Sequence, residues 1–251
     1  MSKNPDFLIL GAQKAGTTSL HAYLNQHPDI IFHQVKEFHF FDIQYYRGFE
    51  WYSSLFPVDA TKITGEATPY YLFHPCVPER VKKHLPHVKM IVLLRNPVDR
   101  AYSHFRHGLK YSHETVKSFE EAIGMEAQRL QGAEDQLLDG SLQEHASHQQ
   151  HSYLTRGFYS VQIQWWFAHF PRSQFLFIQS EKLFVAPQEQ LERVYRFLDI
   201  PSFSMTEYPI FNEGQYGAPL APSLRAELME LFRDDIVQTE TFTGLTFDWR
   251  T

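Results

Sequence analysis

The sequence predicts a single α/β domain built on a central parallel sheet that is flanked by helices. Short apolar runs alternate along the chain with segments of helical periodicity. This alternation implies right-handed strand–helix–strand units, because parallel neighbours need a crossover connection. The chain has 251 residues, 43% of them hydrophobic, and no stretch that reads as a linker. We therefore expect one domain over residues 1–251.

Apolar runs provide the expected strands. Residues Asp6–Gly11, Val88–Leu94 and Gln174–Ile178 are almost wholly apolar, which is typical of parallel strands buried on both faces. Shorter strands are expected near Ile30–Phe32 and Lys62–Gly65.

Helices are expected where apolar residues recur every three or four positions. They are Thr17–Asn25, Cys76–His84, Val98–Lys110, Ser118–Arg129, Gly157–Phe170, Pro187–Leu198 and Ser223–Phe232. Residues 132–151 are polar and rich in Gln, His and Glu, so we expect a mobile surface segment there.

Charge and cysteine content exclude several classes of protein. The formal net charge of −6 argues against a nucleic-acid partner, which would need a basic field. Cys76 is the single cysteine, so an internal disulfide is excluded and a reducing compartment fits. The early apolar run ends at Leu10, too short for a signal peptide or a membrane span. We expect a cytoplasmic protein without a membrane partner.

A glycine-rich turn joins the first strand to the first helix. Gly11 and Gly16 have the spacing of the ATP-binding phosphate loop, in which backbone N–H groups converge on phosphate oxygens. The lysine that usually follows the second glycine is replaced by Thr17, and Lys14 lies inside the loop instead. The turn could be a mere tight connection, but its strand–loop–helix context favours an anion site.

The strand Val88–Leu94 ends at Arg95. Nucleoside-triphosphate enzymes commonly place an aspartate at such a strand end to hold magnesium. An arginine repels a metal and attracts a second phosphate, although a surface ion pair is the alternative reading. Ser103 follows about two turns into the next helix and could share that phosphate. Together the two sites indicate a nucleotide with two separated anionic ends and no metal.

Four segments carry a resemblance to a known family. Phe7–Leu20, Lys36–Asp42, Glu66–Tyr70 and Ile91–Ser103 resemble the sulfotransferases that use 3′-phosphoadenosine 5′-phosphosulfate (PAPS). The branch of the heparan sulfate 3-O- and N-sulfotransferases, with its bacterial relatives, is the most similar. The resemblance implies a P-loop-like, nucleoside-kinase-like sulfotransferase fold and PAPS as the sulfuryl donor.

The resemblance also implies roles for individual residues. Lys14, Ala15, Gly16, Thr17, Thr18 and Ser19 would hold the 5′-phosphosulfate. Arg95 and Ser103 would hold the 3′-phosphate, and Tyr159 would line the nucleotide pocket. Glu37 would be the catalytic base of a direct in-line transfer, with Lys14 stabilising the leaving oxygen. His39 would share a face with Glu37 on a strand and could orient it or the acceptor.

The chain departs from the family pattern at two places. Related 3-O-sulfotransferases have a lysine where this chain has Ala67. Lys36, directly before Glu37, could partly compensate, but neighbours on an extended segment are expected to point to opposite sides. The segment 211–222 is short and lacks the basic residues and cysteines of the related lid, although Gly214, Tyr216 and Gly217 could form a simpler one. The missing cation at Ala67 speaks against a long, highly anionic acceptor.

The acceptor stays open between a carbohydrate and a small alcohol such as a polyketide-type metabolite. A phosphate-loop kinase is the alternative enzyme, but it needs a strand-end acid and a lysine after Gly16. A PAPS-binding protein without catalysis is the third reading. His145, His148 and His151 recur every three residues without a carboxylate arranged as a fourth ligand, so we expect no metal site there.

Overall fold

The structure is a computed structural model that describes residues 4–57, 59, 61–211 and 219–249. The chain divides into two compact units. The first contains Met1–Leu94 and Trp166–Asn212, and the second contains Arg95–Trp165 and Glu213–Thr251.

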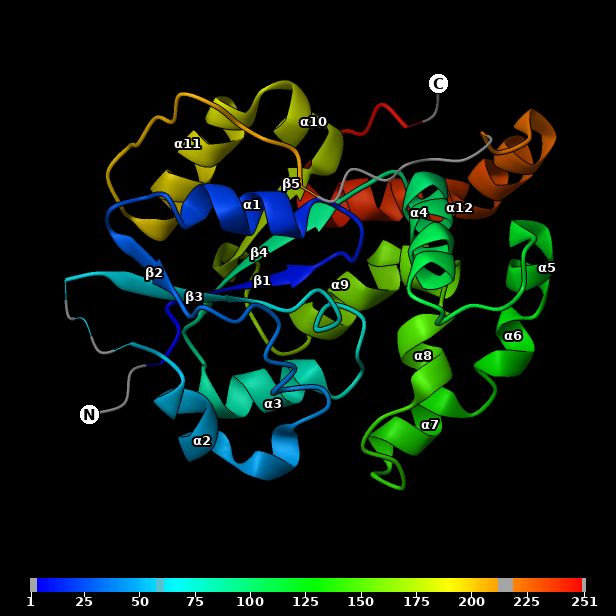
Figure 1. Ribbon diagram of the computed structural model, residues 1–251, viewed down its shortest axis with the longest axis horizontal. Coiled ribbons are helices and arrows are strands. Elements are labelled where there is room, and N and C mark those ends of the chain that lie inside the picture. The colour runs from blue at the N-terminus through cyan, green and yellow to red at the C-terminus, as the bar shows by residue number, and fades with distance from the viewer. Residues whose placement is uncertain (1–3, 58, 60, 212–218, 250–251) are drawn as a thin grey trace. The chain divides into compact units, whose positions relative to one another are not determined.

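A five-stranded parallel sheet forms the centre of the first unit (Figure 1). Its strands are β1 (Phe7–Gly11), β2 (Ile30–Phe32), β3 (Ile63–Ala67), β4 (Lys89–Leu94) and β5 (Phe175–Gln179), in the spatial order β2-β3-β1-β4-β5. Ile9 of β1 pairs with Ala67 on one side and with Ile91 on the other. The expected strands and the α/β class with a central parallel sheet are confirmed.

Helices cover both faces of this sheet, which explains why β1, β4 and β5 are almost wholly apolar. Figure 1 shows α1 (Thr17–Leu24), α10 (Ser180–Val185) and α11 (Pro187–Leu198) on one face, and α2 (Phe49–Ser54) and α3 (Val77–His84) on the other. Every residue of β1 is buried. Two 3₁₀ turns, η1 (Tyr45–Arg47) and η3 (Arg172–Gln174), complete the unit.

The second unit is helical in the part of it that the structure describes. It contains α4 (Pro97–Lys110), α5 (Phe119–Gly124), α6 (Glu126–Arg129), α7 (Ala133–Leu138), α8 (Ala146–Gln150), η2 (Thr155–Gly157) and α12 (Pro222–Thr243). α9 (Tyr159–Phe167) begins here, and its last two residues belong to the first unit. Among the described residues, no helix is both long enough and apolar enough to cross a membrane.

Three sequence-based expectations for this unit are corrected. Residues 118–129 form two short helices with Gly124 at the junction, since glycine weakens a helix interior. α12 continues to Thr243, where Gly244 ends it in a left-handed conformation. The polar residues 132–151 contain α7 and α8, because a ring nitrogen of His145 caps α8 and His148 is buried.

Candidate active site

The glycine-rich turn folds as a loop that leads directly into α1. Gly11, Lys14 and Gly16 have φ values of 146°, 70° and 91°. The N–H of Ala15 donates to the carbonyl of Ala12 at 3.1 Å, and Gly16 is the residue that caps α1. A helix N-terminus preceded by such a loop attracts anions, because its amide groups and the helix dipole both favour negative charge.

Close packing explains why both glycines are required. A Cβ atom on Gly11 would lie 2.8 Å from the carbonyl oxygen of Pro69. On Gly16 it would lie 2.9 Å from the ring of Phe184. Any other residue at either position would combine this crowding with an unfavourable positive φ.

The hydroxyl groups after the loop differ in their surroundings. Thr18 is half-buried, and its Oγ1 accepts a hydrogen bond from Lys36 Nζ at 3.4 Å. Thr17 and Ser19 are buried, and Ser19 Oγ accepts from the backbone N–H of Phe211 at 3.1 Å. The Ser19 hydroxyl is thus bonded to the protein backbone. The Thr18 hydroxyl instead contacts Lys36, which in turn contacts the predicted base Glu37.

Lys36 connects the start of α1 to Glu37. Its ammonium contacts both Thr18 Oγ1 and Glu37 Oε1. The expectation that Lys36 and Glu37 point to opposite sides of an extended segment is wrong. Glu37 has a φ of 65° and His39 a φ of 51°, so the segment turns at each of these residues instead of running as a strand. This left-handed conformation costs about 1 kcal/mol or more for a non-glycine residue and must be held by its surroundings.

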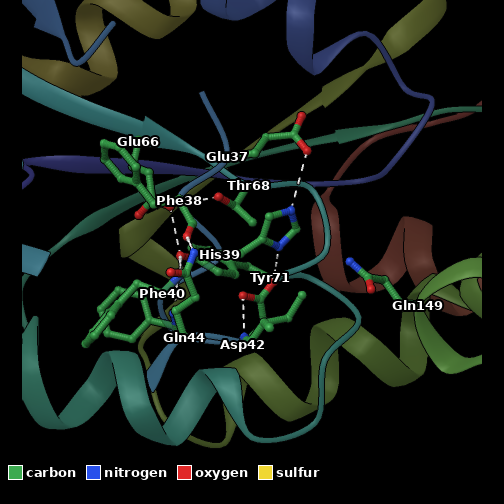
Figure 2. Close-up of polar contacts among 12 residues, drawn as sticks. Glu37, Phe38, His39, Phe40, Asp42, Gln44, Glu66, Thr68, Tyr71 and Gln149 are labelled. Carbon is green, nitrogen blue, oxygen red and sulfur yellow. Dashed lines mark hydrogen bonds and ion pairs between the residues drawn. The ribbon is translucent and has the colours of Figure 1, made fainter. Parts of the chain in front are cut away.

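Glu37, His39 and Asp42 form a chain of acid, imidazole and acid (Figure 2). His39 Nε2 lies 3.7 Å from Glu37 Oε2, and His39 Nδ1 lies 2.7 Å from Asp42 Oδ2. The expected proximity of Glu37 and His39 is confirmed, although left-handed turns produce it and not a strand. The Asp42 side chain is fully buried, while that of Glu37 is 39% exposed. The exposed end of the chain can therefore meet an acceptor.

The charges of this chain follow from its contacts. Burial raises the pKa of Glu37, but the contacts with His39 and Lys36 outweigh burial and bring its pKa down to about 2. Burial lowers the pKa of His39, but Asp42 and Glu37 outweigh it and raise its pKa to about 10. At neutral pH Glu37 is thus ionised and His39 is protonated. An ionised carboxylate can accept a proton, although a pKa this low makes Glu37 a weak base, and the imidazolium fixes its direction.

Asp42 is the residue that the sequence reasoning missed. Its Oδ1 accepts from the N–H of Ile43 at 2.7 Å, and Arg80 Nη1 donates to the carbonyl oxygens of Phe41 and Asp42 at 2.7 and 2.9 Å. The available signal was an acid three positions after His39. That spacing indicates a pair only once the local backbone is known to turn.

The predicted 3′-phosphate residues belong to the second unit. Arg95 is half-buried, and its carbonyl accepts from the hydroxyl of Tyr159 at 2.9 Å. The N–H of Tyr159 donates to Asp235 Oδ2 at 2.9 Å. Ser103 is buried two turns into α4, as expected. The structure therefore brings Tyr159 and Arg95 together, and it shows Tyr159 holding the backbone of Arg95.

The histidines of residues 145–151 and the possible lid residues were the other candidates from the sequence. No group of three or more His, Cys, Asp or Glu side chains within the described ranges could hold a metal ion. His151 Nε2 instead lies 3.0 Å from the carbonyl oxygen of His113. The possible lid residues Gly214, Tyr216 and Gly217 lie outside the described residues.

The fold and this site define a class. A parallel sheet in which a glycine loop leads from β1 into a helix N-terminus is the arrangement of P-loop-like α/β proteins. The family model described as "Sulfotransferase domain" matches residues 4–214. The chain belongs to the sulfotransferase family.

Individual relatives agree with this assignment. The chain is 31% identical over 210 residues to the bifunctional heparan sulfate N-deacetylase/N-sulfotransferase 1 of Caenorhabditis elegans, a match that covers 81% of this chain and 23% of the relative. It is 30% identical to the mouse heparan sulfate glucosamine 3-O-sulfotransferase 3B1, covering 83% of this chain and 50% of the relative. The chain thus spans a quarter to a half of these curated relatives.

A solved bacterial structure matches over the whole chain. The sulfotransferase from Alicyclobacillus acidocaldarius has a TM-score of 0.82 and 29% identity, and the match covers 99% of this chain and 100% of that one. A mouse sulfotransferase, SULT7A1, solved with PAP shares the fold at a TM-score of 0.60 and 16% identity. The predicted P-loop-like fold is confirmed.

Proposed function

We propose that this chain transfers a sulfuryl group from PAPS to an acceptor hydroxyl. The observation that carries the proposal is the position of Lys36, whose ammonium contacts both Thr18, at the start of α1, and Glu37. A single cation thus joins the end that would bind the donor to the carboxylate that would take the acceptor proton. A transfer reaction needs this proximity, because it proceeds only when donor, acceptor and base are held together.

The reaction is a direct displacement at sulfur. The acceptor oxygen forms a new bond to sulfur while the bond from sulfur to the 5′-phosphate oxygen breaks, and the acceptor proton passes to Glu37. The products are the sulfate ester and adenosine 3′,5′-bisphosphate. Lys14, Lys36 and the amides at the start of α1 would stabilise the charge that grows on the leaving oxygen. His39, protonated through Asp42, would hold Glu37 in place.

The 3′-phosphate of the donor is assigned to Arg95 and Ser103. Arginine binds phosphate through a planar fork of donors, which supports this role. Tyr159 would act on Arg95 through its backbone carbonyl and Asp235 in turn holds Tyr159. Four other loop residues would contribute backbone amides at most. Gly16 has no side chain, that of Ala15 is apolar, and those of Thr17 and Ser19 are buried.

The acceptor is a carbohydrate or a small alcohol. Relatives whose names specify heparan sulfate support the carbohydrate class. Ala67 is 2% exposed and supplies no cation, but the Lys36 ammonium contacts Glu37, so the alanine alone does not determine the charge of the acceptor. No nucleic acid, metal or membrane partner is proposed. The cytoplasmic location and the single domain over residues 1–251 stay predictions.

A ligand-binding experiment separates this proposal from a kinase. Adenosine 3′,5′-bisphosphate should raise the melting temperature of the chain without a metal, and ATP with magnesium should not. Radiolabelled PAPS incubated with cell extract should then give a labelled organic product, whose identification names the acceptor. Stabilisation by ATP with magnesium alone would contradict the proposal.

A further inference from the structure

A buried hydroxyl holds the backbone of the segment that carries Glu37 and His39. Tyr71 Oη accepts hydrogen bonds from the N–H groups of Phe40 at 2.9 Å and Phe41 at 3.2 Å. The same hydroxyl donates to Glu66 Oε1 at 2.8 Å. Figure 2 shows Tyr71 and Glu66 beside this segment. One side chain thus binds two successive amides between His39 and Asp42.

Glu66 fixes the direction of that hydroxyl. Thr68 Oγ1 donates to Glu66 Oε1 at 2.7 Å, and the hydroxyl of Tyr52 donates to Oε2. Glu66 is 3% exposed, and Tyr52 and Tyr71 are completely buried. Each of the three hydroxyl groups points its hydrogen at this buried carboxylate, which determines the direction of each O–H bond. The lone pairs of Tyr71 Oη therefore face the two amides.

The segment needs such support because its backbone is strained. Glu37 and His39 both have positive φ values, and residues in this region persist only where contacts hold them. Gln44 Nε2 donates to the carbonyl of Phe38 at 2.7 Å and Arg80 binds the carbonyls of Phe41 and Asp42. Among these supports, Tyr71 is the one that binds amide groups at the centre of the segment. Without its hydroxyl, two buried N–H groups would lose their acceptor.

We propose that Tyr71, oriented by Glu66, is a positioning residue for the Glu37–His39–Asp42 chain. Its side chain is completely buried, so it would act without touching donor or acceptor, by fixing the backbone between His39 and Asp42. The proposal rests on the proposed function, in which Glu37 is the base. Glu66 in β3 and Tyr71 thus gain a role, although both are remote in sequence from residues 36–42.

The first test measures the backbone directly, without any substrate. Tyr71→Phe should speed the hydrogen exchange of the Phe40 and Phe41 amides about tenfold, because each loses its acceptor. Tyr195→Phe is the matched control, since Tyr195 is 1% exposed and its hydroxyl has no hydrogen-bond partner within the described structure. Equal exchange at Phe40 and Phe41 in both variants would overturn the proposal.

The second test separates positioning from general stability. Tyr71→Phe should lower the rate of labelled product formation from PAPS and cell extract at least tenfold, while the affinity for adenosine 3′,5′-bisphosphate stays within twofold of wild type. Glu66→Gln retains one carbonyl acceptor and should give a smaller loss, and Glu66→Leu a larger one. These Glu66 variants keep the test open if Tyr71→Phe fails to fold. Full turnover in a folded Tyr71→Phe protein would contradict the proposal.

A double variant distinguishes failure of this proposal from failure of the proposed function. If Tyr71 acts through Glu37, Tyr71→Phe should cause little further loss in a Glu37→Gln background. Full additivity of the two losses would reject the positioning role. If Glu37→Gln alone keeps wild-type turnover, the base assignment fails, and the hydrogen-exchange result still decides whether Tyr71 holds the segment.

Discussion

His39 Nδ1 lies 2.7 Å from the fully buried Oδ2 of Asp42, while His39 Nε2 faces Glu37 at 3.7 Å. The imidazole thus bridges a buried acid and a half-exposed one. This arrangement keeps His39 protonated at neutral pH, because both neighbours favour its charged form. The exposed carboxylate is therefore oriented by a cation whose own charge is set deeper in the protein.

Replacing Asp42 should make activity sensitive to pH in the neutral range. In Asp42→Asn, the pKa of His39 should fall from about 10 toward its ordinary value of 6.5. Turnover should then decline between about pH 6 and pH 8 as His39 loses its proton, whereas the wild type stays flat. Asp199→Asn, at an 82% exposed site, is the control. A flat profile for Asp42→Asn would show that the charge of His39 does not matter.

Glu37→Gln should lower turnover roughly 10²–10⁴-fold, which is the usual contribution of a general base. The affinity for adenosine 3′,5′-bisphosphate should stay near that of wild type, because the carboxylate faces the acceptor. Turnover with labelled PAPS and calorimetric titration check the two expectations. A variant that keeps most of its turnover would remove Glu37 from the mechanism.

Lys14→Ala should raise the reaction barrier by about 3–4 kcal/mol, as the loss of a donor to a developing oxyanion does. The effect should fall mainly on turnover, since the charge on the leaving oxygen grows only during transfer. Steady-state kinetics with varied PAPS measure this split. A change confined to the apparent affinity for PAPS would assign Lys14 to ground-state binding.

Arg95→Ala should weaken the binding of PAPS far more than the binding of adenosine 5′-phosphosulfate, which lacks the 3′-phosphate. Titration calorimetry with both compounds measures the difference. Equal losses for the two compounds would remove Arg95 from the 3′-phosphate site. Tyr159→Phe should show the same preference with a smaller loss, because the Tyr159 hydroxyl binds the backbone carbonyl of Arg95.

Glu66 should make the protein less stable as the pH rises. Burial raises its pKa from 4.5 to about 7, against hydrogen bonds from Tyr52, Thr68 and Tyr71 that lower it. The folded state then binds a proton more tightly than the unfolded state, so this group's contribution to stability falls by about 3 kcal/mol between its unfolded and folded pKa values. Urea unfolding of Glu66→Gln and wild type should show the variant gaining relative stability from pH 5 to pH 8. A constant difference would contradict the raised pKa.

The sequence by itself determined the strands, the glycine loop and the family resemblance. Strands buried on both faces are mostly apolar, and the loop at the end of β1 requires Gly11 and Gly16. These signals are local, so they can be read from neighbouring residues. They also sufficed to place Glu37 and His39 close together, although for the wrong geometric reason.

Only the tertiary structure decided how Glu37 is held. The left-handed turns at Glu37 and His39 are unfavourable in isolation, so no local propensity predicts them. Contacts from outside the segment support them, among them the hydroxyl of Tyr71, which accepts from the amides of residues 40 and 41. The burial of Asp42 has the same origin, since contacts between segments distant in sequence determine it. Local chemistry thus specified the donor loop, and long-range packing specified the direction of the base.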